Sequence, residues 1–390
     1  MGRMSAAAKI KSLLYLTAAG YSALAFVSIY KGNERFYKDV VMPLVHQLDP
    51  EKAHELAIFI AKYKLIPKPL YNDPLILKTK MFEKTLSNPI GLAAGFDKHG
   101  EAVMGLRNMG FGFVEIGSVT PNPQSGNEKP RLFRLPEDLA IINRYGFNSV
   151  GHDFVSEQLE EIRTKQNLNY TIGVNLGSNK TSTDIIRDYV EGVKKFGALC
   201  DYFVINISSP NTPGLRNMQI KVALASLLKA VVETKNNLQQ LVKPYIFLKL
   251  APDLSYEEQK DIAEVLKMKS CKIDGLIVSN TTVERPDHLQ NQDKTEVGGL
   301  SGQPLKDVST KIISNMYKLT DGMFIIGVGG IFTGKDAYDK IKAGASLVQL
   351  YTGMVYEGPP IVTKVKKELV QLLTDDGHTS VSEAVGKDVK

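Results

Sequence analysis

The stretch YFVINISSPNTPG at residues 202–214 changes from apolar to polar within a few positions. Its first half is a β-branched, apolar run, which is typical of a strand buried in a parallel sheet. Two prolines and a glycine then end the strand and begin a loop. A capped strand end rich in Ser and Asn would give the same local pattern. We expect a strand that presents polar side chains at its carboxyl end, namely Asn206, Ser209, Asn211 and Thr212.

The same design recurs along the chain. Apolar runs of strand length occupy residues 88–94, 111–119, 170–177, 202–209, 245–252, 275–282, 324–330 and 347–353. Helical patterns fill most of the gaps, at residues 101–109, 184–196, 222–236, 257–267, 308–317 and 335–343. Such alternation over about 280 residues predicts a closed (β/α)₈ TIM barrel in the α/β class. An open doubly wound sheet is the alternative, but the G-x-G-x-x-G motif expected after its first strand is missing.

Composition excludes several classes of function. The 390 residues are 43% hydrophobic and 23% charged, which is ordinary for a globular protein and argues against large disordered regions. The net charge of +6 is not gathered into a basic stripe with interleaved aromatics, so we expect no nucleic-acid partner. Cys200 and Cys271 lie beside different apolar runs and are predicted to be buried thiols. The six histidines show no metal-binding spacing, so no metal is expected.

Residues 1–33 contain no acidic residue and include an uncharged run at 13–30. A basic, acid-free leader is typical of mitochondrial import, and the run is just long enough to cross a bilayer. We therefore expect a mitochondrial leader that holds the protein in a membrane by a single span. A cleaved presequence that leaves a soluble protein is the alternative.

Residues 34–72 hold two short helical patterns, and 73–390 form the predicted barrel. Asp49 and Pro50 supply an N-cap and a first-position proline for the second helix. That helix is apolar over most of its surface and needs an apolar partner. It could pack on the barrel, lie in a lipid interface or line a lipophilic channel. A hairpin is expected at 77–85, and the long insertion at 120–169 is expected to form a lid or binding wall.

The predicted strands end in polar residues, at the face where barrels carry their active sites. Gly329, Gly330 and a flexible, donor-rich loop at 298–302 are suited to bind a phosphate. Lys249 lies on a buried strand and needs an anionic or electron-rich partner, for which an isoalloxazine ring is suitable. Amides suit a planar heterocycle such as a pyrimidine. Such amides stand at Asn143, Asn175, Asn206, Asn211 and Asn280.

Five segments together resemble the signature sequences of the quinone-dependent, class 2 mitochondrial dihydroorotate dehydrogenase family. They are NPIGLAAGFDK (88–98), EIGSVTP (115–121), NRYGFN (143–148), NISSPNT (206–212) and GVGGI (327–331). The likeness runs collinearly over about residues 36–375 and is highly specific because so many long segments match. It implies oxidation of dihydroorotate to orotate with FMN and ubiquinone, in de novo pyrimidine (UMP) biosynthesis, at the mitochondrial inner membrane.

The resemblance also implies residue roles. Ser209 matches the catalytic base, and Lys98 balances the substrate carboxylate. The implied FMN contacts are Ala94, Gly95, Lys98, Ser118, Asn143, Asn175, Asn206, Lys249, Ser279, Ser301, Gly302, Gly329, Gly330, Tyr351 and Thr352. The implied substrate contacts are Lys98, Asn143, Tyr145, Gly146, Phe147, Asn206, Asn211, Asn280 and Thr281. The helix pair becomes the quinone entrance, with a polar lining of His54, Arg134 and Tyr351.

Two alternatives to this function stay open at the level of sequence. One is an FMN barrel that acts on another heterocycle with a soluble electron acceptor. The other is a membrane-tethered binding barrel without catalysis, against which the presence of Ser209, Lys98 and Lys249 argues.

Overall fold

Eight parallel strands close into a barrel in this computed structural model, which describes residues 5–165 and 170–389. The strands are β3 (Ile90–Leu92), β4 (Phe113–Val119), β7 (Thr171–Leu176), β8 (Tyr202–Asn206), β9 (Tyr245–Leu250), β10 (Gly275–Val278), β12 (Phe324–Val328) and β13 (Leu347–Leu350). Neighbours in the barrel follow the chain order, and β13 pairs with β3 to close it. The predicted (β/α)₈ barrel is therefore confirmed, and the open sheet is excluded.

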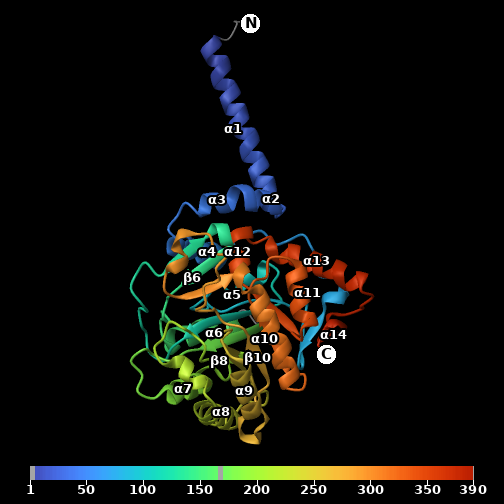
Figure 1. Cartoon of the computed structure of the whole chain (residues 1–390). Helices are drawn as coiled ribbons and strands as arrows, with labels where there is room; N and C mark the ends of the chain where they lie inside the picture. Colours follow the sequence, from blue (N-terminus) through green and yellow to red (C-terminus); the bar gives the residue numbers. More distant parts are fainter. Residues whose placement is uncertain (1–4, 166–169, 390) are drawn as a thin grey trace.

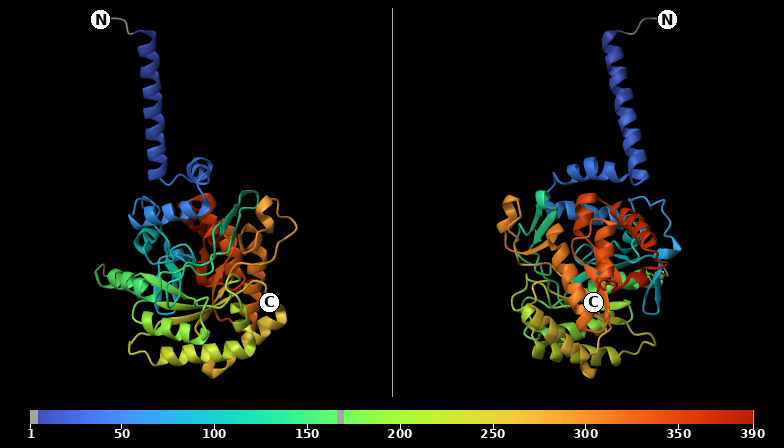
Figure 2. Two further views of the ribbon diagram at one scale, coloured as in Figure 1. Left: turned by 90° about the vertical axis from the view of Figure 1, so that its left-hand side faces the viewer. Right: turned by 45° about the vertical axis from the view of Figure 1, so that its right-hand side comes forward.

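Helices cover the outside of the barrel (Figures 1 and 2). They are α5 (Val103–Asn108), α6 (His152–Lys165), α7 (Ile185–Phe196), α8 (Lys221–Asn236), α9 (Tyr256–Lys267), α10 (Lys306–Leu319), α11 (Gly334–Lys342), α13 (Ile361–Asp375) and α14 (Val381–Ala384). The short helix α12 (Thr352–Glu357) instead follows β13 at the carboxyl end of the strands and contacts the N-terminal helical segment. Short 3₁₀ segments lie at Leu75–Leu77, Pro136–Asp138, Leu215–Gln219, Lys269–Cys271, Gln292–Thr295 and Gln303–Leu305. Apolar side chains between strands and helices form the main core, which includes the buried Cys200 and Cys271 as predicted.

A hairpin closes the amino-terminal end of the barrel, at the predicted place. It consists of β1 (Thr79–Met81) and β2 (Lys84–Leu86). Phe82 at its turn packs on Tyr245 and Phe324, which begin β9 and β12, with ring centroids 4.3 and 4.8 Å away. Because this end is filled with apolar side chains, the cavity can open only at the opposite, carboxyl end of the strands.

The insertion after β4 builds one wall above the carboxyl ends of the strands. Its strands β5 (Leu132–Leu135) and β6 (Ala140–Asn143) form an antiparallel sheet with β11 (Gly299–Gly302). The prediction of a flexible loop at 298–302 is thus wrong, because the segment pairs in register with β6. The expected binding wall is present, and α6 completes the insertion as a barrel helix.

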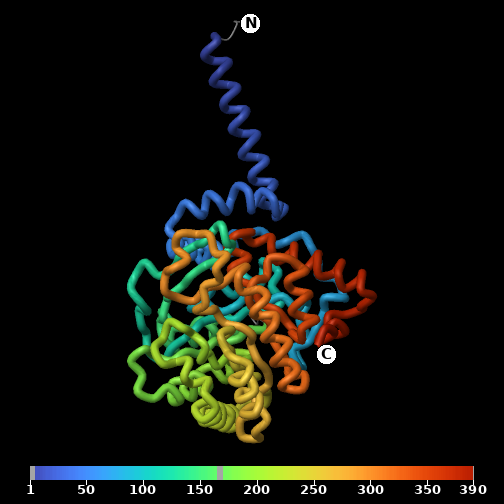
Figure 3. The backbone as a smooth tube through the Cα atoms, in the orientation of Figure 1, coloured from blue at the N-terminus to red at the C-terminus, as the bar shows by residue number. Residues whose placement is uncertain are grey.

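The N-terminal segment begins with α1 (Ala6–Tyr30), a straight helix that stands away from the barrel (Figures 1 and 3). It is long and apolar enough to cross a membrane, and none of its residues is buried. A second, crosswise helix follows from α2 (Glu34–Phe36) through a π-helical turn (Tyr37–Val41) to α3 (Met42–Val45). The uncharged run predicted to span a membrane, at 13–30, lies within α1, while the domain boundaries at 33 and 72 stay predictions.

Helix α4 (Pro50–Lys62) begins as predicted, because the Asp49 side chain accepts hydrogen bonds from two first-turn N–H groups. It packs very closely on α5. A Cβ at Gly105 would come within 1.9 Å of the carbonyl oxygen of Ala61, so only glycine permits this contact. The helix pair is fixed to the barrel at a second place by an ion pair of 2.7 Å between Lys38 and Glu357 of α12.

Candidate active site

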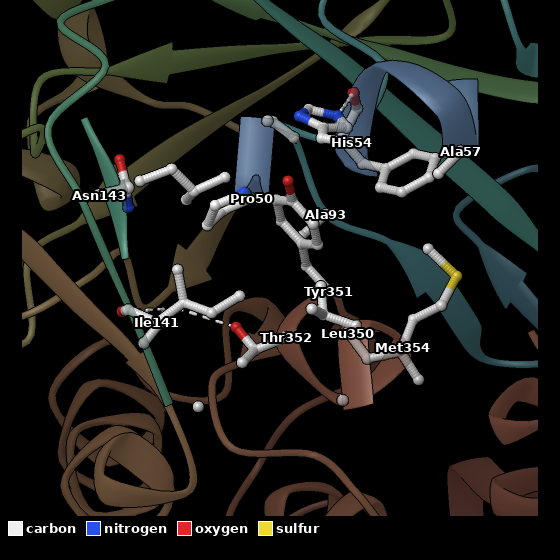
Figure 4. A pocket seen from close by; sticks show the side chains of 18 of the residues that line it. Pro50, His54, Ala57, Ala93, Ile141, Asn143, Leu350, Tyr351, Thr352 and Met354 are labelled. Carbon is white, nitrogen blue, oxygen red and sulfur yellow. Dashed lines mark hydrogen bonds between the residues drawn. The ribbon is translucent and has the colours of Figure 1, made fainter. Parts of the chain in front are cut away.

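One cavity of about 550 Å³ runs from the carboxyl ends of the barrel strands to the two N-terminal helices (Figure 4). Its inner part is polar and is lined by asparagine, serine and lysine side chains from the strand ends. Its outer part is apolar, with residues such as Ala57 and Met354 from α4 and α12. The cavity can therefore hold a polar ring system at one end and a lipophilic molecule at the other.

Amide side chains form two hydrogen-bonded groups in the inner part, one around Asn206 and one that joins Asn211 to Asn143. Asn206 Nδ2 donates to Asn175 Oδ1 at 2.9 Å and to Ser118 Oγ at 3.1 Å. Asn280 Nδ2 donates to Asn206 Oδ1 at 3.2 Å, and Asn211 Nδ2 donates to Asn143 Oδ1 at 3.3 Å. These bonds fix the amide orientations, so the site presents defined donors and acceptors to a planar ligand.

Lys249 of β9 has an anionic partner, Glu115 of β4, that the sequence analysis did not predict. Its Nζ is 3.6 Å from Glu115 Oε1, and both side chains are buried. The Glu115 carboxylate also accepts hydrogen bonds from Asn175 Nδ2 at 2.7 Å and Gln349 Nε2 at 2.8 Å. Glu115 is the one charged residue in the apolar segment FVEIGSV at 113–119, and this feature of the sequence could have indicated a buried carboxylate that needs a partner. Lys249 thus has a resident anion and still faces the cavity.

Ser209 lies just beyond β8, where the chain turns into a loop over the cavity. Its Oγ accepts a hydrogen bond of 3.3 Å from the Asn211 N–H. Arg216 fixes the base of the loop by donating to the carbonyl oxygens of Ser208 and Thr281, both at 3.1 Å, and by pairing with Asp253 at 2.6 Å. Within the described residues, Thr212 makes no hydrogen bond to Ser209.

Lys98 enters the cavity from the segment after β3. Its ammonium lies 4.0 Å from the ring centroid of Tyr145, and Arg131 lies on the same ring at 5.0 Å. Burial lowers the pKa of Lys98 to about 7, while Glu51 acts in the opposite direction. Tyr145 and Asn148 both line the cavity, and in the described residues Tyr145 Oη and Asn148 Oδ1 are buried without a partner. An anionic, hydrogen-bonding ligand would satisfy this group of atoms.

The segment at 143–148 has an unusual backbone. Gly146 and Phe147 have φ values of +68° and +54°. A Cβ at Gly146 would lie 2.7 Å from Asn127 Nδ2, so this position needs glycine for both space and conformation. The turn directs Tyr145 and Phe147 into the cavity wall.

The end of the cavity formed by β11, β12 and β13 is rich in donors. Ser301 Oγ and Thr352 Oγ1 are 2.9 Å apart, and Ser279 Oγ donates to the Asn280 carbonyl at 3.0 Å. Gly329 and Gly330 have φ values of +116° and +69°, and both line the cavity. This combination of glycine amides and hydroxyls is suited to a phosphate group.

The outer part of the cavity contains two histidines. His54 of α4 contacts the Phe96 carbonyl through Nε2 at 2.7 Å, and its ring lies 6.2 Å from that of Tyr351 (Figure 4). Burial lowers the pKa of His54 to about 3, so it is neutral at physiological pH. His46, which the sequence reasoning missed, contacts the Val355 carbonyl at 2.8 Å, and burial lowers its pKa as well. Arg134 donates to the Leu48 carbonyl between α3 and α4.

The structure brings nearly all predicted site residues together around this cavity. Those that line it are Ala94, Gly95, Lys98, Ser118, Asn143, Tyr145, Gly146, Phe147, Asn206, Ser209, Asn211, Lys249, Ser279, Asn280, Thr281, Ser301, Gly302, Gly329, Gly330, Tyr351 and Thr352, together with His54 and Arg134. Asn175 is the exception. It is fully buried behind Ser118 and Asn206 and acts by orienting both.

Fold and cavity together define a (β/α)₈-barrel enzyme with a polar strand-end site and a lipophilic approach. A family model for dihydroorotate dehydrogenase matches residues 76–373. The mitochondrial quinone-type dihydroorotate dehydrogenase of Mus musculus is 51% identical over 92% of this chain and 91% of its own length. The Arabidopsis thaliana counterpart is 48% identical over 90% and 81%. The ligand-free Eimeria tenella dihydroorotate dehydrogenase superposes with a TM-score of 0.85 at 45% identity, over 88% of this chain and all of that one.

The chain belongs to the dihydroorotate dehydrogenase family, as the sequence segments predicted.

Proposed function

We infer that this chain is a quinone-dependent dihydroorotate dehydrogenase of pyrimidine biosynthesis, and that FMN is its cofactor. The single observation that supports this most strongly is the joining of a polar strand-end site to a lipophilic channel in one cavity. One end can hold dihydroorotate and the other a quinone, with a redox cofactor between them.

The donor set of the inner cavity fits FMN. Backbone N–H groups of Gly329 and Gly330 and the hydroxyls of Ser301 and Thr352 would hold its phosphate. Lys249 and the amide of Asn206 would contact the ring system. When bound, FMN supplies a hydride acceptor next to the substrate.

Substrate binding follows from the same geometry. The asparagine amides at 143, 206, 211 and 280 would pair with the ring nitrogens and carbonyl oxygens of dihydroorotate, and Lys98 would neutralise its carboxylate. Ser209 lines the same cavity as these amides and would take the proton from C5 as the C6 hydride leaves. Because a serine hydroxyl is a weak base, that proton must pass onward to a neighbouring group or water.

The quinone would enter between α3 and α4 and stop near Tyr351 and His54. Its carbonyl oxygens need polar partners in an apolar channel, and Arg134 supplies N–H donors there. We further propose that α1 anchors the chain in the mitochondrial inner membrane, which places the channel mouth beside the lipid that dissolves ubiquinone.

An absorption spectrum of the purified protein, recorded before and after dihydroorotate, tests this function. We expect visible flavin bands that bleach on adding dihydroorotate and return on adding a ubiquinone analogue. A protein without flavin absorption, or one that bleaches with other heterocycles and recovers only with soluble acceptors, would contradict the proposal.

A further inference from the structure

Lys340 of α11 is fully buried, and within the described residues no carboxylate lies within 4.0 Å of its ammonium. All its hydrogen-bond partners are neutral. Nζ donates to the Lys306 carbonyl at 3.1 Å, to Thr310 Oγ1 at 2.9 Å and to Ser309 Oγ. A buried cation without a paired anion is costly, so its presence calls for an explanation.

The partners of Lys340 all lie in the first turn of α10, which adjoins α11 (Figure 1). This turn also supports the loop after β12. Ser309 Oγ lies 3.3 Å from the Gly329 carbonyl oxygen. A Cβ at Gly330 would approach the Cα of Lys306 to 2.6 Å, so this glycine rests directly on the start of α10. Lys340 therefore contacts, through Ser309 and the start of α10, the loop that carries Gly329 and Gly330 at the proposed phosphate end of the cavity.

Other charges around Lys340 do not neutralise it directly. Asp336 accepts hydrogen bonds from the N–H groups of Phe332 and Thr333 and lies 3.6 Å from Lys306 Nζ. Asp307 and Asp339 act on Lys340 only at longer range. Burial lowers the pKa of Lys340 to about 7 despite these three carboxylates, so a further anion nearby would help to keep it charged.

We propose that Lys340 is a positioning residue for the phosphate of the flavin, and that it acts through Ser309 and the first turn of α10. It holds the loop at 329–330 in the conformation that exposes its N–H groups, and it places a positive charge behind them. This rests on the proposed function, since it assumes that FMN is the cofactor. The prediction that follows is specific: Lys340 should favour FMN over riboflavin, which has the same ring system but no phosphate.

A second buried lysine offers a matched control. Lys366 of α13 is 1% exposed, but its ammonium pairs with Asp73 at 2.6 Å and donates to the Gly110 carbonyl at 3.0 Å, away from the cavity lining. Lys366→Met should therefore destabilise the fold without changing the choice between flavins. Comparison with Lys340→Met separates a specific effect on phosphate from general loss of stability.

The experiment incubates the purified holoenzyme with a large excess of riboflavin and measures both bound flavins by chromatography after removal of free flavin. We expect Lys340→Met to lower the preference for FMN by about tenfold or more, which is the order expected for loss of one buried charge-assisted interaction. Lys366→Met should keep the wild-type preference. Ser309→Ala removes the hydroxyl that connects Lys340 to the Gly329 carbonyl and keeps the lysine. Its preference for FMN should lie between those of the two lysine variants, and it replaces Lys340→Met in the test if that variant does not fold.

An unchanged preference in folded Lys340→Met, or in Ser309→Ala where Lys340→Met does not fold, would overturn the inference. An equal fall in Lys366→Met would overturn it as well, because the effect would then reflect stability alone. If the wild-type protein carries no FMN at all, the proposed function itself fails, and this result is distinct from the other two.

Discussion

The Lys249 ammonium lies 3.6 Å from the Glu115 carboxylate across the interior of the barrel, although two other strands separate β9 from β4. Lys249 therefore has two roles that can be separated. It compensates a buried carboxylate, and from the cavity lining it would face the ring of the proposed cofactor.

We expect Lys249→Met to lose about 3–5 kcal/mol of stability, because Glu115 would remain buried without its charge partner. The double variant Lys249→Met with Glu115→Gln should regain much of that stability, but it should still bind or reduce FMN poorly. Thermal unfolding and the ratio of flavin to protein absorbance measure the two effects. A double variant with normal flavin content and normal bleaching would show that Lys249 is only a structural partner of Glu115.

The barrel could be predicted from the sequence because each strand and helix has its own local pattern, and the polar residues that follow each strand mark the site. Contacts between distant segments could not be predicted in this way. The strand Gly299–Gly302 reads as a flexible loop because its partners in β6, Ala140–Asn143, lie far away along the chain. Glu115 and His46 were missed for the same reason, since their partners Lys249 and Val355 lie far along the chain. We predicted that Asn175 lines the cavity, because a sequence does not show whether a polar side chain at a strand end lines the cavity or lies behind the residues that do.

Orotate affinity should depend on pH through Lys98. Burial lowers the pKa of this lysine to about 7 in the free site, and a bound carboxylate would raise it. Since the folded pKa lies below the ordinary value, Lys98 is charged below pH 7 and loses its charge as the pH rises through that value. We therefore expect the dissociation constant of orotate to rise above pH 7, by up to about tenfold per pH unit.

Flavin absorbance changes on titration with orotate between pH 6 and 9 measure this dissociation constant. Lys98→Gln should bind weakly with little pH dependence over that range, and an equal slope in that variant would assign the titration to another group.

Helix α1 should be needed for membrane attachment but not for chemistry. Its 25 residues extend about 38 Å at about 1.5 Å per residue, enough to cross a hydrocarbon layer of about 30 Å. A chain that starts at residue 34 is expected to need detergent only for its helix pair and to keep flavin reduction by dihydroorotate. Liposome flotation compares its membrane association with that of the full chain. Equal flotation of both would place the membrane contact in the helix pair, and loss of flavin reduction would show that α1 supports the barrel.

Filling the outer channel should affect only the quinone half of the reaction. Ala57 lines the apolar part of the cavity and lies on α4, well placed to obstruct it (Figure 4). We expect Ala57→Phe to slow reoxidation by ubiquinone by about tenfold or more while flavin reduction by dihydroorotate stays near the wild-type rate. Lys52→Phe introduces the same side chain on the same helix at an exposed position outside the cavity lining, and it should change neither rate. Rapid mixing measures each half-reaction separately, and equal loss in both would argue against a quinone channel along α4.

Ser209 provides the most specific prediction about catalysis. Its hydroxyl accepts only the Asn211 N–H within the described residues, while in the proposed site the amides and Lys98 bind the ligand. Ser209→Ala should therefore bind FMN and orotate nearly normally but reduce the flavin about 10²–10⁴-fold more slowly. Ser209→Cys should retain part of the activity with a shifted pH optimum, because a thiol ionises closer to neutrality.

Thr212→Val is the matched control. It removes the next hydroxyl along the loop, which makes no hydrogen bond to Ser209, and we expect a rate of flavin reduction within about threefold of wild type. Stopped-flow bleaching across pH measures all three variants. If Ser209→Ala keeps its rate within about threefold, Ser209 only caps the strand; if Thr212→Val is slowed as strongly as Ser209→Ala, the proton passes along the loop through Thr212.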